Sequence, residues 1–184
     1  CPSREESWPL IRAFVAHELA WFAAVDTVQL WFYDPGGCLC AQCRSDLTGP
    51  LVRQVRECRA LMAVHCPQAD LCVSTWPIWA WEAQLKQPYG AALLDRLAEL
   101  PAPSRPAAVF DSAQRADAFL KHARQRGFAT HAFFFSANVE SPFVFFHPHF
   151  EFYRTTAQQV AQEQHDGAVI HSIQAGAKWL DTWI

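Results

Sequence analysis

Segments with the apolar spacing of helices alternate along this chain with short apolar runs typical of buried strands. Apolar side chains recur at the spacing of helical turns in the helical segments, whereas the first three strand-like runs end close to a Pro or Asp. The strand-like runs cover residues 28–33, 70–75, 107–110, 130–135 and 167–171. A helical segment precedes each of them. This alternation predicts a parallel sheet with right-handed helical crossovers, covered on both faces.

The expected helices begin and end at recognisable residues. Ser3 and Glu6 have the spacing of a capping box ahead of a first helix. The apolar positions of that helix share one face and are Trp8, Ile11, Val15, Leu19 and Phe22. The later helices are expected over residues 49–65, 89–100, 116–126 and 155–164. Gly127 directly follows one of these helices, where a left-handed residue commonly ends a helix.

Two α/β folds accommodate five such units. A parallel (β/α)8 barrel, the TIM barrel, needs about 250 residues, so a chain of 184 residues would supply only its C-terminal half, about five βα units. The alternative is an open, doubly wound parallel sheet, which would be complete at this length. The barrel is favoured because neither G-x-G-x-x-G nor G-x-x-x-x-G-K-S/T follows any expected strand. No linker divides the chain, so residues 1–184 are expected to form one partial barrel domain.

Both ends of the sequence have the character of cuts in a longer protein. The chain opens at Cys1 rather than at Met, without the basic and apolar regions of a signal peptide. Residues 178–184 have the pattern of a helix that has only begun. We therefore expect the domain to be truncated at both ends.

Charge and hydropathy exclude several classes of partner. The net charge is −3, and the Lys and Arg residues are scattered rather than gathered on one stripe, so no nucleic acid is expected to bind. No apolar run approaches the roughly 20 residues of a membrane-spanning helix, so no membrane partner is expected. Nothing in the sequence indicates a compartment or an oligomeric state.

In either fold, functional side chains gather where the parallel strands end. The candidates for catalysis are Asp34, Asp111 and His171, because carboxylates on different strand ends can act as acid and base. The candidates for substrate binding are Tyr33, Trp76, Trp79, Asn138, Glu140 and Gln174. The aromatic members suit stacking on the apolar face of a sugar ring.

Structural roles explain the same residues. Asp34 precedes Pro35-Gly36-Gly37 and is a good turn residue whatever the function. Asp111 could cap the following helix, and His171 could be a hydrogen-bonded core histidine. The tryptophans could be core or helix-packing residues.

Three cysteines follow the first expected strand within six positions: Cys38, Cys40 and Cys43. Three thiolates at this spacing can bind one zinc ion, with a fourth ligand from Cys72, a histidine or water. A disulfide within the cluster, or free thiols where a loop meets a helix, are the alternatives. No second Cys or His pair follows at zinc-finger spacing. No cofactor is required by the sequence, and a structural zinc is the candidate.

Two stretches of the chain resemble a known group of proteins. Residues 30–43, which run from the first strand through Asp34 to the cysteines, and residues 167–184, with His171 and Gln174, look like uncharacterised barrel proteins related to β-N-acetylhexosaminidases and α-glucuronidases. The resemblance implies a TIM-barrel glycoside hydrolase with an acidic residue at the end of its fourth strand. Hexosaminidases carry adjacent Asp and Glu there, with Glu as the general acid, whereas Pro35 follows Asp34 here.

The leading functional hypothesis is therefore a glycoside hydrolase-like domain that acts on or binds a carbohydrate. If Asp34 does not protonate the leaving group, the acid must come from Asp111, Glu140 or residues outside this chain. One alternative is a barrel that binds carbohydrate without cleaving it. Another is a metal-dependent hydrolase that uses the loop of Cys38, Cys40 and Cys43.

Overall fold

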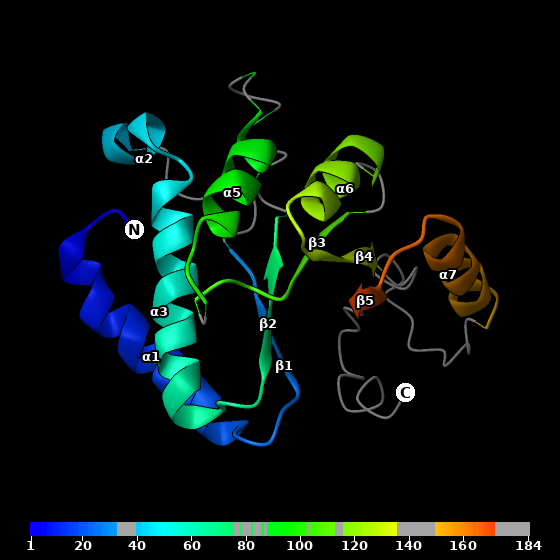
Figure 1. Cartoon of the computed structure of the whole chain (residues 1–184). Helices are drawn as coiled ribbons and strands as arrows, with labels where there is room; N and C mark the ends of the chain where they lie inside the picture. The colour runs from blue at the N-terminus through cyan, green and yellow to red at the C-terminus, as the bar shows by residue number, and fades with distance from the viewer. Residues whose placement is uncertain are drawn as a thin grey trace, which may run out of the picture.

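The computed structural model describes residues 1–32, 40–75, 78, 82, 86, 88–102, 104–112, 116–135 and 150–171. Within these residues, strands and helices alternate in the expected order (Figure 1). The strands are β1 (Thr27–Leu30), β2 (Asp70–Ser74), β3 (Ala108–Ser112), β4 (Ala129–Phe135) and β5 (Gly167–His171). The helical elements are η1 (Glu5–Ser7), α1 (Trp8–Trp21), α2 (Ala41–Ser45), α3 (Gly49–His65), α5 (Tyr89–Ala98), α6 (Ala116–Gln125) and α7 (Phe150–Gln162).

The five described strands form one parallel sheet in the order β1-β2-β3-β4-β5. Each strand is added on the same side of the strand before it, without the reversal of order that defines a doubly wound sheet. The sheet curls, so that β4 and β5 lie at a large angle to β1 and β2 (Figure 1). The described strands therefore make a half-barrel.

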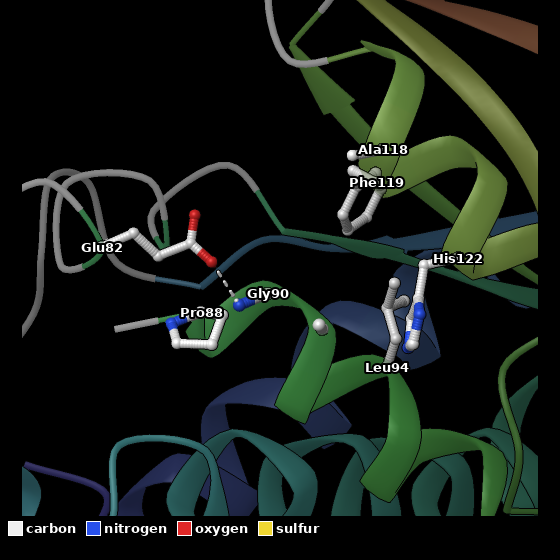
Figure 2. Close-up of a pocket in the computed structure, with 8 residues that line it drawn as sticks. Glu82, Pro88, Gly90, Leu94, Ala118, Phe119 and His122 are labelled. Carbon is white, nitrogen blue, oxygen red and sulfur yellow. Dashed lines mark hydrogen bonds between the residues drawn. The ribbon is translucent and has the colours of Figure 1, made fainter. Parts of the chain in front are cut away.

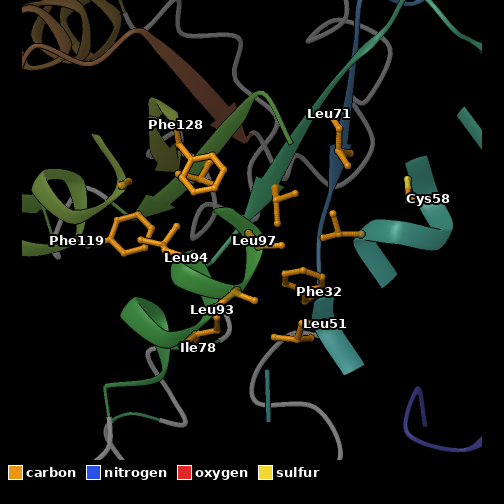
Figure 3. Packing of buried hydrophobic residues seen from close by; sticks show 14 of the residues in the cluster. Phe32, Leu51, Cys58, Leu71, Ile78, Leu93, Leu94, Leu97, Phe119 and Phe128 are labelled. Carbon is orange, nitrogen blue, oxygen red and sulfur yellow. The ribbon is translucent and has the colours of Figure 1, made fainter. Parts of the chain in front are cut away.

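One face of the sheet is covered by helices. Buried side chains of α3, α5 and α6 pack on the strand residues Leu71, Val73 and Val109 in a single core cluster (Figure 3). The helical members include Leu51, Val55, Met62, Leu93, Leu94, Leu97 and Phe119. The apolar residues that recur at helical spacing in these segments are therefore the residues that the helices bury.

The other face of the sheet carries a smaller cluster. Its members are Cys72, Ala108, Phe110 and Phe133, with Trp31 and Ala129 packed against them. Among the described residues, this cluster contains none from a helix. This face is the inner face of the curl. The sequence predicted a sheet covered on both faces. In the described part of the chain, helices cover the outer face, and the smaller cluster lies on the inner face.

The predicted start of the first helix was wrong. Ser3 and Glu6 form no capping box, and residues 5–7 instead form the 3₁₀ turn η1 ahead of α1. The Ser3 hydroxyl lies 3.2 Å from Cys43 Sγ and 2.9 Å from Cys1 Sγ, so a long-range contact occupies it. Phe22 was also wrongly placed on the buried face, since α1 ends at Trp21 and the Phe22 side chain is 59% exposed.

Other local predictions were confirmed. Helix α3 spans the expected residues, with Pro50 near its start. Gly127 has a φ of +76°. Its N–H donates to the carbonyl of Arg124, and the N–H of Phe128 donates to that of Ala123, which is the hydrogen-bond pattern of a Schellman C-cap. In the described part of the chain, no helix has the length and apolar character needed to cross a bilayer.

Candidate functional site

Most of the strand-end residues singled out in the sequence lie outside the described residues. These are Tyr33, Asp34, Cys38, Trp76, Trp79, Asn138, Glu140 and Gln174. Their roles stay predictions. The described members of the predicted set are Asp111, His171, Cys40 and Cys43.

Asp111 and His171 lie at the carboxyl edge of the sheet, where the parallel strands end. Asp111 pairs in register with Ala132, and His171, the last residue of β5, pairs with Phe135. Along β4, the level of Asp111 therefore lies three residues before the level of His171.

An aromatic cluster lines the inner face just below this edge. Trp31 follows β1 directly, and its ring packs edge-on against Phe110 at 5.1 Å and Phe133 at 4.9 Å between centroids. Phe110 and Phe133 are buried, whereas Trp31 is half-buried. An indole that is partly open at the mouth of a half-barrel can offer a ring face to a ligand.

His131 is an inner-face residue that the sequence analysis did not single out. Its Nδ1 lies 3.6 Å from Cys72 Sγ, and it is paired in register with Gly167. Burial lowers the pKa of His131, and burial raises the pKa of the Cys72 thiol to about 12. The pair is thus a neutral thiol beside a neutral imidazole at neutral pH, which is not the thiolate and imidazolium of a cysteine nucleophile.

Thr75, directly after β2, has a structural role. Its backbone N–H and its hydroxyl both donate to the carbonyl of Phe110, at 2.9 and 3.2 Å. The side chain is fully buried. This residue therefore extends the pairing of β2 with β3 to the rim.

A cavity of about 360 Å³ opens between α5 and α6 (Figure 2). It is lined by Glu82, Pro88, Gly90, Ala91, Leu94, Ala118, Phe119 and His122. Glu82 accepts a hydrogen bond of 2.6 Å from the Gly90 N–H at the start of α5, and His122 Nε2 lies 2.7 Å from Asp95 Oδ1. These contacts cap one helix and join it to the next, so structural roles account for both side chains.

The most compact group of potential metal ligands contains Cys1, Cys40 and Cys43. The three Sγ atoms lie within 4.8 Å of one another, and those of Cys1 and Cys43 are 3.5 Å apart. Cys43 is buried, Cys40 is half-buried and Cys1 is exposed. This trio could hold a metal ion such as zinc.

The structure therefore replaces part of the expected ligand set. Cys40 and Cys43 come together as expected, because Cys40 is the N-cap of α2 and Cys43 lies in its first turn. Cys72, one of the expected sources of a fourth ligand beside a histidine or water, lies on the inner face of the sheet in a different cluster. Cys1 was not expected as a ligand, because it lies 39 residues before Cys40 in the sequence.

Comparisons of the sequence with models of protein families, with curated proteins and with solved structures found no match in any of the three. The function of this chain is therefore inferred from the half-barrel, its strand ends and its clusters of side chains.

Proposed function

We propose that this chain is the later part of a (β/α)8 barrel that acts on or binds a carbohydrate at the carboxyl ends of its strands. The observation that carries the proposal is the half-barrel itself, with a partly open tryptophan at the mouth of its inner face. Catalytic sites of (β/α)8 barrels lie at this face. Aromatic rings there suit the apolar face of a sugar.

Two features support a full barrel. The strand order continues in one direction, so further strands at both edges would close the curl. Helix α1 leaves Leu10, Phe14 and Trp21 between 64% and 75% exposed on one face. A further βα unit packed there would bury these side chains.

The carboxylates expected to do the chemistry are Asp34 and Asp111, with Glu140 as a further source of the general acid. His171 is expected to position the substrate or to transfer a proton. A structural zinc held by Cys38, Cys40 and Cys43 would leave this chemistry unchanged. A metal-dependent hydrolase built on the same loop is the second candidate. The close approach of the sulfurs of Cys1, Cys40 and Cys43 favours it.

The test is the release of sugar from a panel of aryl glycosides, including β-N-acetylglucosaminides, glucuronides and glucosides, by the whole protein. Asp34→Asn or Asp111→Asn is expected to lower kcat by about a hundredfold or more, as the loss of a general acid or base does. Asp70→Asn is the control, because Asp70 begins β2 at the opposite edge of the sheet. Removal of bound metal by a chelator should abolish activity only if the metal-dependent alternative holds.

Binding is measured separately from cleavage. Trp31→Ala should weaken glycan binding, whereas Trp21→Ala should not, because Trp21 lies at the end of helix α1 and not on the inner face of the sheet. Binding that survives both aspartate substitutions, with no product released, would identify the non-catalytic alternative. A protein that neither cleaves nor binds any member of the panel would contradict the carbohydrate proposal.

A further inference from the structure

We propose that Cys1, Cys40 and Cys43 together bind one zinc ion, which clips the N-terminal segment to helix α2. The site uses none of the strand-end residues of the proposed carbohydrate site. It therefore stands or falls independently of the carbohydrate proposal.

The spacing of the sulfur atoms fits a tetrahedral metal. Three thiolates around one zinc ion, with Zn–S bonds of about 2.3 Å, stand about 3.8 Å apart. The three Sγ atoms lie within 4.8 Å of one another, and those of Cys1 and Cys43 are 3.5 Å apart. The thiols need to shift by only about 1 Å to reach the tetrahedral arrangement. A disulfide between Cys1 and Cys43 would instead require about 2.05 Å.

The ligands on α2 are held by the helix itself. Cys40 and Cys43 are three residues apart across its N-terminus, so their side chains share one side of the first turn. The N–H of Arg44 donates to the carbonyl of Cys40 at 2.9 Å and closes that turn. Asp46, just after α2, forms an ion pair with Arg96 of α5 at 2.7 Å. This ion pair and the burial of Cys43 and Leu47 in the core cluster place α2 against the helix layer.

The third ligand is held by a separate set of contacts. The buried indole of Trp8 donates to the carbonyl of Pro2 at 3.1 Å, and the N–H of Arg4 donates to the carbonyl of Cys1 at 3.1 Å. Arg53 of α3 lies over the Trp8 ring, 4.2 Å from its centroid, and pairs with Glu5. These contacts seat the N-terminal segment on α3. Cys1 is thereby brought to Cys43, 42 residues away in the sequence.

Ser3 completes the surroundings of the three sulfurs. Its hydroxyl lies 2.9 Å from Cys1 Sγ, 3.2 Å from Cys43 Sγ and 3.8 Å from Cys40 Sγ. A hydroxyl that donates to a metal-bound thiolate stabilises its negative charge and fixes its orientation. Soft thiolate ligands select zinc over magnesium or calcium, which prefer oxygen. Solvent or another donor would take the fourth tetrahedral position.

The direct test is metal analysis of the whole chain, purified under reducing conditions without chelator. We expect about one zinc per chain, and an absorption band of sulfur-to-metal charge transfer after substitution with Co²⁺. Cys1→Ser, Cys40→Ser and Cys43→Ser should each weaken zinc binding at least about tenfold, and Ser3→Ala by about tenfold as an outer contact. The matched control is Cys66→Ala, which removes a buried thiol at the end of α3 and should leave the zinc content unchanged.

Alkylation of the unaltered protein tests the proposal even if the serine variants fail to fold. Zinc should protect Cys1, Cys40 and Cys43 from iodoacetamide, as mass spectrometry of the labelled peptides would show. The proposal is overturned if the protein binds no zinc and shows neither the cobalt band nor protection. It is also overturned if a Cys1–Cys43 disulfide is present instead, or if the three serine variants retain the full zinc content.

Discussion

Gly167 begins β5 directly against the ring of His131. A Cβ atom at this position would lie 2.9 Å from Cδ2 of that ring, closer than real Cβ contacts come, and 3.0 Å from Nε2, tighter than most of them. Room for a methyl group at position 167 would have to come from a shift of this half-buried ring, which also lies 3.6 Å from Cys72 Sγ. The absence of a side chain at position 167 therefore permits the close approach of β4 and β5.

We expect Gly167→Ala to lower the free energy of unfolding by about 1–3 kcal/mol, the usual cost of overpacking. Alanine in a strand would otherwise be favoured over glycine, so the sign of the change identifies the clash. Urea denaturation measures it. The pair Gly167→Ala and His131→Ala should be far from additive, because removal of the ring makes room for the methyl group. If the two changes in free energy of unfolding add up, or if Gly167→Ala is as stable as the unaltered protein, the His131 ring does not clash with a side chain at position 167.

At the scale of elements, helix α3 is the centre of the helix layer. Its buried residues, Leu51, Val55, Cys58 and Met62, recur every three or four positions and face the sheet. On its other flank α3 packs with α1, where Arg12 Nε and Nη2 each donate to a carboxylate oxygen of Glu57 at 2.7 Å. The sequence pattern predicted the bounds of this helix because its burial repeats with the helical period.

Leu51→Ala is expected to lower the free energy of unfolding by about 2–5 kcal/mol, because it leaves a cavity in a tightly packed core. Leu51 is 1% exposed. Leu10→Ala makes the same chemical change on α1, where the side chain is 75% exposed in this chain, so in residues 1–184 alone it should alter stability by less than about 0.5 kcal/mol. Thermal or urea denaturation compares the two. Equal losses would mean that α3 does not organise the core.

The N-terminal segment shows where local patterns fail. Ser3 and Glu6 have the spacing of a capping box, but the Ser3 hydroxyl contacts the sulfurs of Cys1 and Cys43 instead. Phe22 continues the apolar spacing of α1, but the helix stops one residue earlier and leaves its ring exposed. At Ser3 the outcome depends on Cys43, which lies 40 residues away in the sequence.

At the scale of the whole molecule, the half-barrel buries thiols on both faces of its sheet. Burial raises the pKa of Cys58, on the helix side, to about 11 and that of Cys72, on the inner face, to about 12. Both thiols are thus neutral in the folded chain well above the ordinary thiol pKa of 9.0. In the unfolded chain they lose their protons near that ordinary value.

This difference predicts a loss of stability in alkali. Above about pH 9 the unfolded state binds fewer protons than the folded state, so the free energy of unfolding falls as the pH rises toward the folded pKa values. Each thiol contributes up to about 1.4 kcal/mol per pH unit in that window. Cys72→Ala should therefore flatten the pH dependence between about pH 9 and about pH 11, measured by urea denaturation.

Leu51→Ala is the control for this experiment, since it weakens the core without removing a titrating group. Its pH dependence should stay parallel to that of the unaltered protein. If stability falls with pH as steeply in Cys72→Ala as in Leu51→Ala and the unaltered protein, the Cys72 thiol ionises alike in the folded and unfolded chains.

The sequence alone determined the succession of helices and strands, the parallel sheet and the end of α6 at Gly127, because periodicity and turn residues report burial and backbone geometry locally. Only the tertiary structure decided that the strands follow one another around a curl without reversal, and that His131 faces Cys72. It also brought Cys1 to Cys40 and Cys43. That meeting depends on the packing of the N-terminal segment and α1 against α3, and contacts between segments so far apart leave no periodic trace in the chain.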